Sequence, residues 1–191
     1  MEQTYIHGQT FDKIDFREIH LVKGEYENCT FKNCDFSNSD LSNIKFFECD
    51  FIACNLSMVK LAQTTFTRIK FTDCKMLGFR FDNCNDFMLS VGFDNCSLNF
   101  SSFYKTKIKK TIFKNSQLRE IDFSECDLTG SVFENCDLMQ TTFNSTTIER
   151  TDFRTSYNYS IDPEKNRIKK ARFSLFGVLG LLDKYDIEID H

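Results

Sequence analysis

The sequence contains no tryptophan, a single proline, seven glycines and three histidines in 191 residues. Because proline lacks a backbone hydrogen-bond donor, its absence before Pro163 permits an unbroken hydrogen-bonded backbone over most of the chain. No apolar run approaches the roughly 18–20 residues of a membrane span, and the first residues lack the pattern of a secretory signal. We therefore expect a cytoplasmic protein without membrane association, whose nine cysteines are thiols rather than disulfides.

The scarcity of histidine argues against catalysis. His7, His20 and His191 are the three histidines, so residues 21–190 offer none to a Ser-His-Asp or Cys-His site. The sequence also has no glycine-rich phosphate loop and no Cys-x-x-Cys pair. These absences predict a protein that is not an enzyme and that has no catalytic residue, cofactor or metal site.

Apolar residues return at every fifth position over most of the chain. The first series is Ile6, Phe11, Phe16, Leu21, Tyr26, Phe31, Phe36, Leu41, Phe46, Phe51, Leu56, Leu61, Phe66, Phe71, Met76 and Phe81. After a slip of two residues the second series is Met88, Phe93, Leu98, Phe103, Ile108, Phe113, Leu118, Phe123, Leu128, Phe133, Leu138, Phe143, Ile148 and Phe153. Thirty apolar residues in thirty positions cannot arise by chance at a hydrophobic content of 41%.

A small residue stands two positions before most of these centres, and eight of the nine cysteines lie there: Cys29, Cys34, Cys49, Cys54, Cys74, Cys96, Cys126 and Cys136. A period of five fits neither a helix nor an alternating strand. It fits a chain that turns a corner after every pentad, with one large and one small side chain pointing inward.

Four such sides make a square coil of twenty residues, and backbone hydrogen bonds stack the coils about 4.8 Å apart. Residues twenty apart then lie above one another, as Phe11, Phe31, Phe51 and Phe71 do, and again Phe93, Phe113, Phe133 and Phe153. Cys34, Cys54 and Cys74 would form another column, either as small core residues or as a redox or metal cluster.

The motif of a small residue, a polar residue and a central Leu or Phe resembles the pentapeptide-repeat family over about residues 4–155, as in Cys34-Asp35-Phe36-Ser37-Asn38 and Cys126-Asp127-Leu128-Thr129-Gly130. The resemblance implies an all-β solenoid, a right-handed quadrilateral β-helix of about 7–8 coils and on the order of 36 Å long. We assign residues 1–155 to this solenoid, with a register slip near 82–88, and residues 156–191 to a C-terminal cap.

The cap is predicted to contain a short α-helix over about 175–185, for which Ser174 is a suitable N-cap. Its apolar residues are Leu175, Phe176, Val178, Leu179, Leu182 and Tyr185. A helix this apolar would expose a large patch. We therefore expect these six residues to form a homodimer interface, with capping of the solenoid alone as the alternative.

Charge is distributed unevenly, with ten acidic and six basic residues in 1–60, five and ten in 61–121, and thirteen and eight in 122–191. The densest basic run is Lys105, Lys107, Lys109, Lys110 and Lys114. The densest acidic run holds Asp122, Glu125, Asp127, Glu134, Asp137, Glu149 and Asp152. We take these seven carboxylates as a candidate partner-binding acidic face, with ordinary solubility as the alternative.

The tail, with Ile161-Asp162-Pro163, Ile168 through Ser174 and Gly180-Leu181-Leu182, is similar to that of the quinolone-resistance subgroup of the family. The resemblance implies a dimeric rod that mimics duplex DNA, binds bacterial DNA gyrase or topoisomerase IV, and protects it from quinolones or a gyrase toxin without itself binding nucleic acid. The chain lacks the long loops of several relatives and has a basic middle third. A structural scaffold for another protein is therefore the alternative function.

Overall fold

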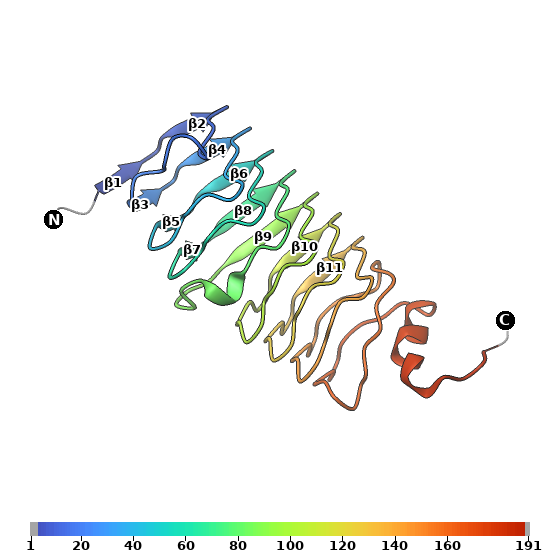
Figure 1. Cartoon of the computed structure of the whole chain (residues 1–191). Coiled ribbons are helices and arrows are strands. Elements are labelled where there is room, and N and C mark those ends of the chain that lie inside the picture. The colour runs from blue at the N-terminus through green and yellow to red at the C-terminus, as the bar shows by residue number, and fades with distance from the viewer. Residues whose placement is uncertain (1–3, 190–191) are drawn as a thin grey trace.

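The computed structural model describes residues 4–189, and these wind as a β-solenoid up to about residue 173 (Figure 1). Parallel strands one turn apart form two sheets. The smaller sheet contains β1 (Thr4–His7), β3 (Gly24–Glu27), β5 (Lys45–Phe47) and β7 (Thr65–Thr67). The larger sheet contains β2 (Thr10–Asp12), β4 (Thr30–Lys32), β6 (Asp50–Ile52), β8 (Ile69–Thr72), β9 (Val91–Asp94), β10 (Ile112–Lys114) and β11 (Val132–Glu134). The predicted β-solenoid is confirmed.

The coil has four sides, which we number faces 1 to 4 in the order in which the chain passes through them. Face 1 carries the smaller sheet and then the pentads centred on Ile108, Leu128, Ile148 and Ile168, and face 2 carries the larger sheet. Face 3 is centred on Phe16, Phe36, Leu56, Met76, Leu98, Leu118 and Leu138, and face 4 on Leu21, Leu41, Leu61, Phe81, Phe103, Phe123 and Phe143. Isolated parallel bridges hold faces 3 and 4 in the same register, as between Asp122 and Thr142.

Most corners are formed by a residue in the left-handed backbone region, two positions after the pentad centre. Asn33, Lys110 and Arg150 are examples, with φ of 54°, 58° and 58°. Asparagine adopts this conformation more readily than most residues, but long charged side chains occupy it here as well. Lys110 and Arg150 are exposed, so the corner positions display their side chains to solvent.

The core is built around one continuous stack of phenylalanine rings behind face 2. Its members are Phe11, Phe31, Phe51, Phe71, Phe93, Phe113, Phe133, Phe153 and Phe173, with neighbouring ring centroids between 4.7 and 5.5 Å apart. The sequence pattern predicts two columns separated by the register slip. They are one column, because β8 pairs with β9 and places Phe71 opposite Phe93.

The two extra residues of the slip lie between η1, a 3-10 helix (Phe81–Asn83), and β9, and this loop projects from the coil in Figure 1. The register of β8 with β9, which pairs residues 22 apart instead of 20, places the insertion in this loop. The expected inward position of Met88 is wrong, since Met88 is 57% exposed and has a φ of 59°. Leu89 is buried in its place, because the insertion puts Met88 at the corner and the next residue inside.

The winding continues beyond Phe153, where the pentad count ends. Phe173 stacks on Phe153 at 5.5 Å, and Arg172 forms a parallel bridge with Asp152. In this last coil Asn166 takes the small inward position, donating a hydrogen bond to the carbonyl oxygen of Phe143 (3.1 Å). The solenoid therefore extends to about residue 173, past the boundary at 155 that the sequence suggests.

The α-helix expected over 175–185 is replaced by two 3-10 helices, η2 (Gly177–Leu181) and η3 (Asp183–Tyr185). A Cβ atom on Gly180 would overlap the carbonyl oxygen of Tyr159, so glycine lets this segment lie directly on the last coil. Ile161 donates its backbone N–H to the carbonyl oxygen of Gly180 at 2.9 Å. This close docking favours the tighter i to i+3 bonds, such as Leu182 N–H to Leu179 C=O (2.8 Å).

No helix within residues 4–189 combines the length and the apolar character that crossing a membrane requires.

Candidate protein-interaction surfaces

The six residues predicted as a dimer interface lie at the C-terminal end of the rod, which is red in Figure 1. Leu175 and Phe176 are 84% and 79% exposed, and Val178, Leu179 and Tyr185 are exposed as well, whereas Leu182 is partly buried. Leu179 and Leu182 line a shallow groove together with Ile187 and Ile189. These two isoleucines are not among the six residues predicted from the sequence, and they extend the apolar end.

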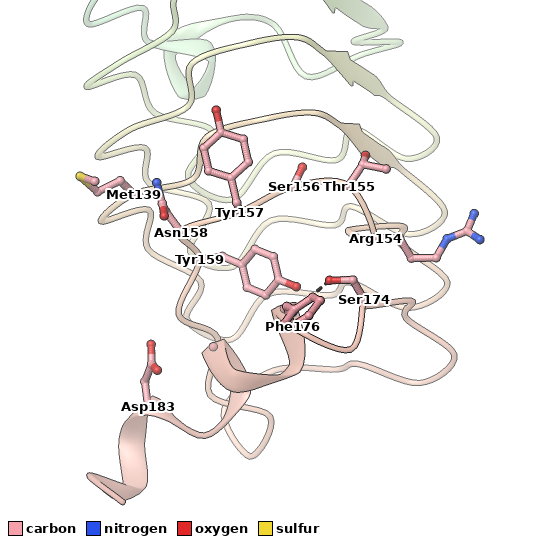
Figure 2. Close-up of a pocket in the computed structure, with 12 residues that line it drawn as sticks. Met139, Arg154, Thr155, Ser156, Tyr157, Asn158, Tyr159, Ser174, Phe176 and Asp183 are labelled. Atoms are coloured by element: carbon pink, nitrogen blue, oxygen red, sulfur yellow. Dashed lines mark hydrogen bonds between the residues drawn. The ribbon is translucent and has the colours of Figure 1, made fainter. Parts of the chain in front are cut away.

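A second groove, of about 630 Å³, lies where the cap meets the last coil (Figure 2). Figure 2 shows Tyr159 and Phe176 among the residues that line the groove, with Arg154 and Asp183 at opposite sides of it. Ser174 Oγ accepts a hydrogen bond from the backbone N–H of Gly177 at 3.0 Å. Tyr159 is buried against Gly177, and burial raises the pKa of its hydroxyl to about 12. This groove adds a polar rim to the apolar end.

The seven carboxylates predicted as one acidic face are distributed over all four faces. Asp127 and Glu149 lie on face 1, Glu134 and Asp152 on face 2, Asp137 on face 3, and Asp122 and Glu125 on face 4. The reason is geometric, because a stretch of thirty residues passes around the coil more than once. Acidic residues that are close in the sequence therefore point in different directions, and they do not form one face.

Most of these carboxylates pair with a basic residue one coil away. The pairs between coils are Lys105–Glu125 (3.5 Å), Lys109–Asp127 (3.1 Å), Lys114–Glu134 (3.9 Å), Arg119–Asp137 (2.6 Å), Arg167–Glu149 (2.9 Å) and Arg172–Asp152 (3.8 Å). Asp152 also pairs with Arg154, two positions further along the same coil (2.7 Å). The basic run of the middle third thus lies beside the acidic run that follows it. Exposed pairs contribute only about 0–1 kcal/mol each to folding, so the main effect of the pairing is to neutralise local charge.

Asp137 has a structural role. Its carboxylate is buried and accepts hydrogen bonds from Arg119 Nε (2.6 Å), Asn158 Nδ2 (2.8 Å) and the N–H of Met139 (3.2 Å). Burial disfavours the ionised form, but the bonds from Asn158 and Arg119 outweigh it and lower the pKa of Asp137. A carboxylate held in this way is not available to a partner.

When the charged residues of 101–173 are sorted by face, the rod is polarised across its width. Faces 3 and 4 carry three basic residues and six acidic ones, a net charge of −3: Lys105, Arg119 and Lys165 against Glu120, Asp122, Glu125, Asp137, Asp162 and Glu164. Faces 1 and 2 carry ten basic residues and four acidic ones, a net charge of +6: Lys107, Lys109, Lys110, Lys114, Arg150, Arg154, Arg167, Lys169, Lys170 and Arg172 against Asp127, Glu134, Glu149 and Asp152. This division is not visible in the linear sequence, because charges that are neighbours along the chain point to different faces.

The cysteines are buried thiols. The column of Cys34, Cys54 and Cys74 lies in the core, and the N–H of Cys34 donates to the sulfur of Cys54 at 3.4 Å. Burial raises the pKa of Cys126 and Cys136 to about 12. These features favour the interpretation of the cysteines as small core residues.

The histidines are dispersed. His7 lies in β1 on face 1, with Nε2 at 3.1 Å from Asn28 Nδ2, and His20 is exposed on face 4. His191 lies outside the described residues. Within residues 4–189, no three His, Cys, Asp or Glu side chains converge where they could hold a metal ion.

The family model described as a pentapeptide repeat region matches residues 24–90 and 86–157. Among solved structures, trypsin-treated QnrB1, a plasmid-mediated fluoroquinolone resistance protein, aligns with a TM-score of 0.58 and 18% identity over 100% of both chains. Full-length QnrB1 aligns with a TM-score of 0.58 and 17% identity over 96% of this chain and 100% of that chain. HetL, a pentapeptide repeat protein involved in heterocyst differentiation regulation from Nostoc sp. strain PCC 7120, aligns with a TM-score of 0.38 and 10% identity over 87% and 86% of the two chains. No curated protein sequence matches at a significant level.

Proposed function

The chain belongs to the pentapeptide-repeat family, and on this basis we propose that it is a non-catalytic, cytoplasmic topoisomerase-protecting protein. In this proposal a dimeric, DNA-like rod binds bacterial DNA gyrase or topoisomerase IV and relieves poisoning by quinolones or by a gyrase toxin. The observation that carries the proposal is the fold likeness to QnrB1, which extends over the whole chain and so includes the cap as well as the coil.

A protein that takes the place of duplex DNA on an enzyme must be straight, stiff and negatively charged on the side that meets the enzyme. The continuous phenylalanine stack supports the first two requirements, because each ring is held between neighbours in hydrogen-bonded coils. Faces 3 and 4 support the third, with a net charge of −3 over residues 101–173. We assign the enzyme-facing side to these two faces, where Glu120 and Glu125 are exposed. A DNA-binding surface attracts such charge at long range.

The apolar C-terminal end supports dimerisation. Leu175 and Phe176 are large apolar residues that are mostly exposed in the single chain, and contiguous patches of this kind usually mark an interaction site. A second copy bound through the same patch would cover both patches with twofold symmetry. The resulting dimer would be a rod of roughly twice the length, about 70 Å plus the caps.

The test is a gyrase supercoiling assay in the presence of a fluoroquinolone. We expect micromolar protein to restore supercoiling, and we expect the double variant Glu120→Lys, Glu125→Lys to lose this protection. Glu134→Lys is the matched control, since Glu134 is an exposed carboxylate on face 2. Absence of protection together with absence of binding to gyrase would end the proposal.

A scaffold for another protein is the second candidate, and the ion pairing favours it. Six of the seven carboxylates of residues 122–152 have a basic partner within 4 Å, and faces 1 and 2 carry net positive charge, unlike duplex DNA. A pull-down from the native host that repeatedly recovers one protein and never a topoisomerase would support this function over the first.

A further inference from the structure

The strongest surface charge of residues 101–173 is basic and lies along the corner between faces 1 and 2. Lys110, Arg150 and Lys170 occupy corner positions in the same column, with Gly130 between the first two. Other basic side chains flank this column. We call the whole set the basic edge, and its members are Lys107, Lys109, Lys110, Arg150, Arg167, Lys169, Lys170 and Arg172, all of them exposed.

Most charges of the basic edge have no acidic partner. Lys109, Arg167 and Arg172 pair with Asp127, Glu149 and Asp152 at 3.1, 2.9 and 3.8 Å. Among residues 4–189 the remaining five, which are Lys107, Lys110, Arg150, Lys169 and Lys170, have no carboxylate oxygen within 4 Å. Eight basic residues against three acidic ones leave a net charge of +5 on this edge.

The edge also offers room for an anion. Arg150, Lys170 and Arg172 line a shallow groove of about 420 Å³ together with Val132 and Asp152. Gly130 has no side chain, and a Cβ atom built on Gly130 would lie 3.6 Å from the Cγ of Lys110. The stem of Lys110 therefore lies over the Gly130 position, and the room for an anion is the groove beside Arg150 and Lys170.

The spacing of the column fits the phosphates of a nucleic acid strand. Each coil advances about 4.8 Å, so Lys110 and Lys170, three coils apart, span about 14 Å. Phosphates of one strand follow each other every 3.4 Å along a DNA duplex axis, so this span covers about four steps from one phosphate to the next. Lysine and arginine are the side chains that most often contact phosphate oxygens.

The surroundings favour duplex DNA over the other polyanions. Single-stranded nucleic acids are usually held by exposed aromatic rings on which bases stack, and protein interfaces usually centre on buried aromatic anchors. The exposed aromatic side chains of residues 101–173 are Tyr104 and Tyr157, which lie on faces 4 and 3. Faces 1 and 2 thus present charge without a stacking platform in this region.

We propose that the basic edge binds the phosphate backbone of duplex DNA without reading its sequence. This changes the sequence-based expectation that the protein does not contact nucleic acid. The proposal does not depend on topoisomerase protection, because it rests on faces 1 and 2 and the enzyme-facing surface is assigned to faces 3 and 4. If both hold, the protein contacts an enzyme and DNA on opposite sides.

The experiment is fluorescence anisotropy with two labelled 20-base-pair duplexes of unrelated sequence, titrated with the full chain at several salt concentrations. We expect equal affinity for both duplexes, with a Kd of about 10⁻⁴–10⁻⁶ M. The logarithm of the binding constant should fall with the logarithm of salt concentration with a slope of about −3 to −4, as four phosphate contacts require.

The test variant is Lys110→Glu, Arg150→Glu, Lys170→Glu, and the matched control is Lys60→Glu, Lys105→Glu, Lys165→Glu on face 4, which changes the net charge by the same amount. The first should lose at least tenfold in affinity and the control less than threefold. A milder variant, Lys110→Gln, Arg150→Gln, Lys170→Gln, should reduce the salt slope by about three and serves if the glutamate variant does not fold.

Three results would overturn the proposal: no binding at 100 µM protein in about 50 mM salt, equal losses in the two triple variants, or tighter binding of single strands or polyglutamate than of the duplex. Protection of gyrase is measured on the two triple variants of the basic edge, which leave faces 3 and 4 unchanged. Since their acidic faces are unchanged, loss of DNA binding with retained protection separates the failure of one proposal from the failure of the other.

Discussion

Replacing Phe113 with alanine tests the packing on which the whole rod depends. Phe113 is fully buried, and its ring stacks on Phe93 at 5.0 Å and on Phe133 at 4.7 Å. It also meets Phe103 and Phe123 edge to face, at 5.9 Å in each case. The substitution removes the ring from the middle of the stack and ends four aromatic contacts at once.

The expected loss of stability is large because the residues around Phe113 can relax only slightly into the cavity. A buried Phe→Ala change costs about 3–5 kcal/mol, depending on how far the neighbours relax into the cavity. Phe93 and Phe133 belong to coils held at fixed separation by the pairing of β10 with β9 and β11. These strands cannot approach each other to fill the cavity without breaking hydrogen bonds. We therefore expect the free energy of unfolding to fall by an amount in the upper part of this range, about 4–5 kcal/mol.

The assay is guanidinium unfolding followed by far-UV circular dichroism, since the chain has no tryptophan to report by fluorescence. Phe100→Ala is the matched control, because Phe100 is 58% exposed and the same atoms are removed from it. We expect the control to change the free energy of unfolding by about 0.5 kcal/mol or less. A loss below about 1 kcal/mol for Phe113→Ala, or equal losses for both variants, would refute the stacked-core interpretation.

Three further predictions concern the cap, the thiols and the buried carboxylate. Leu179→Asp should convert a dimer into a monomer in light scattering, because it places a charge in the apolar end, and an unchanged mass would reject the dimer. Burial raises the pKa of Cys49, Cys126 and Cys136 from 9.0 to about 12, so their protonated forms stabilise the folded chain fully below pH 9, and this stabilisation is lost as pH rises from 9 to 12. The melting temperature should therefore fall between pH 9 and 12, and less steeply in the triple serine variant; equal slopes would contradict this account. Asp137→Asn should cost about 1–3 kcal/mol, since Arg119 loses its charged acceptor, whereas Glu134→Gln should cost less than about 0.5 kcal/mol. Because the pKa of Asp137 is lowered, its contribution is present above its unfolded pKa and is lost as pH falls, so a thermal scan of the variant should also show reduced acid sensitivity.

The solenoid could be predicted from sequence because its determinant is local. One large and one small side chain per pentad point inward, and twenty residues later the same position returns, as at Phe113 and Phe133. The predicted end of the solenoid failed because the count of apolar residues at every fifth position breaks at Asn158 and Pro163. Tyr159 and Ile161 are buried outside that count, and Ile168 and Phe173 then resume it against the same core.

The surfaces could be predicted only in part. The apolar cap residues are adjacent in the chain and stay adjacent in space, so the sequence indicates them directly. Charges on a coil are different, because their neighbours are about twenty residues away. Lys105 pairs with Glu125 and Lys114 with Glu134, and only the register shows that the acidic and basic runs neutralise each other while a separate basic edge remains.

The division of charge across the rod has a consequence for how the molecule meets its partners. A net charge of +6 on two faces and −3 on the opposite two gives the C-terminal half an electric dipole perpendicular to its long axis. Near a strongly charged surface such a rod experiences a torque that sets its roll angle before contact is made. The same molecule would therefore approach a cationic surface and an anionic one with opposite sides, without any change in shape.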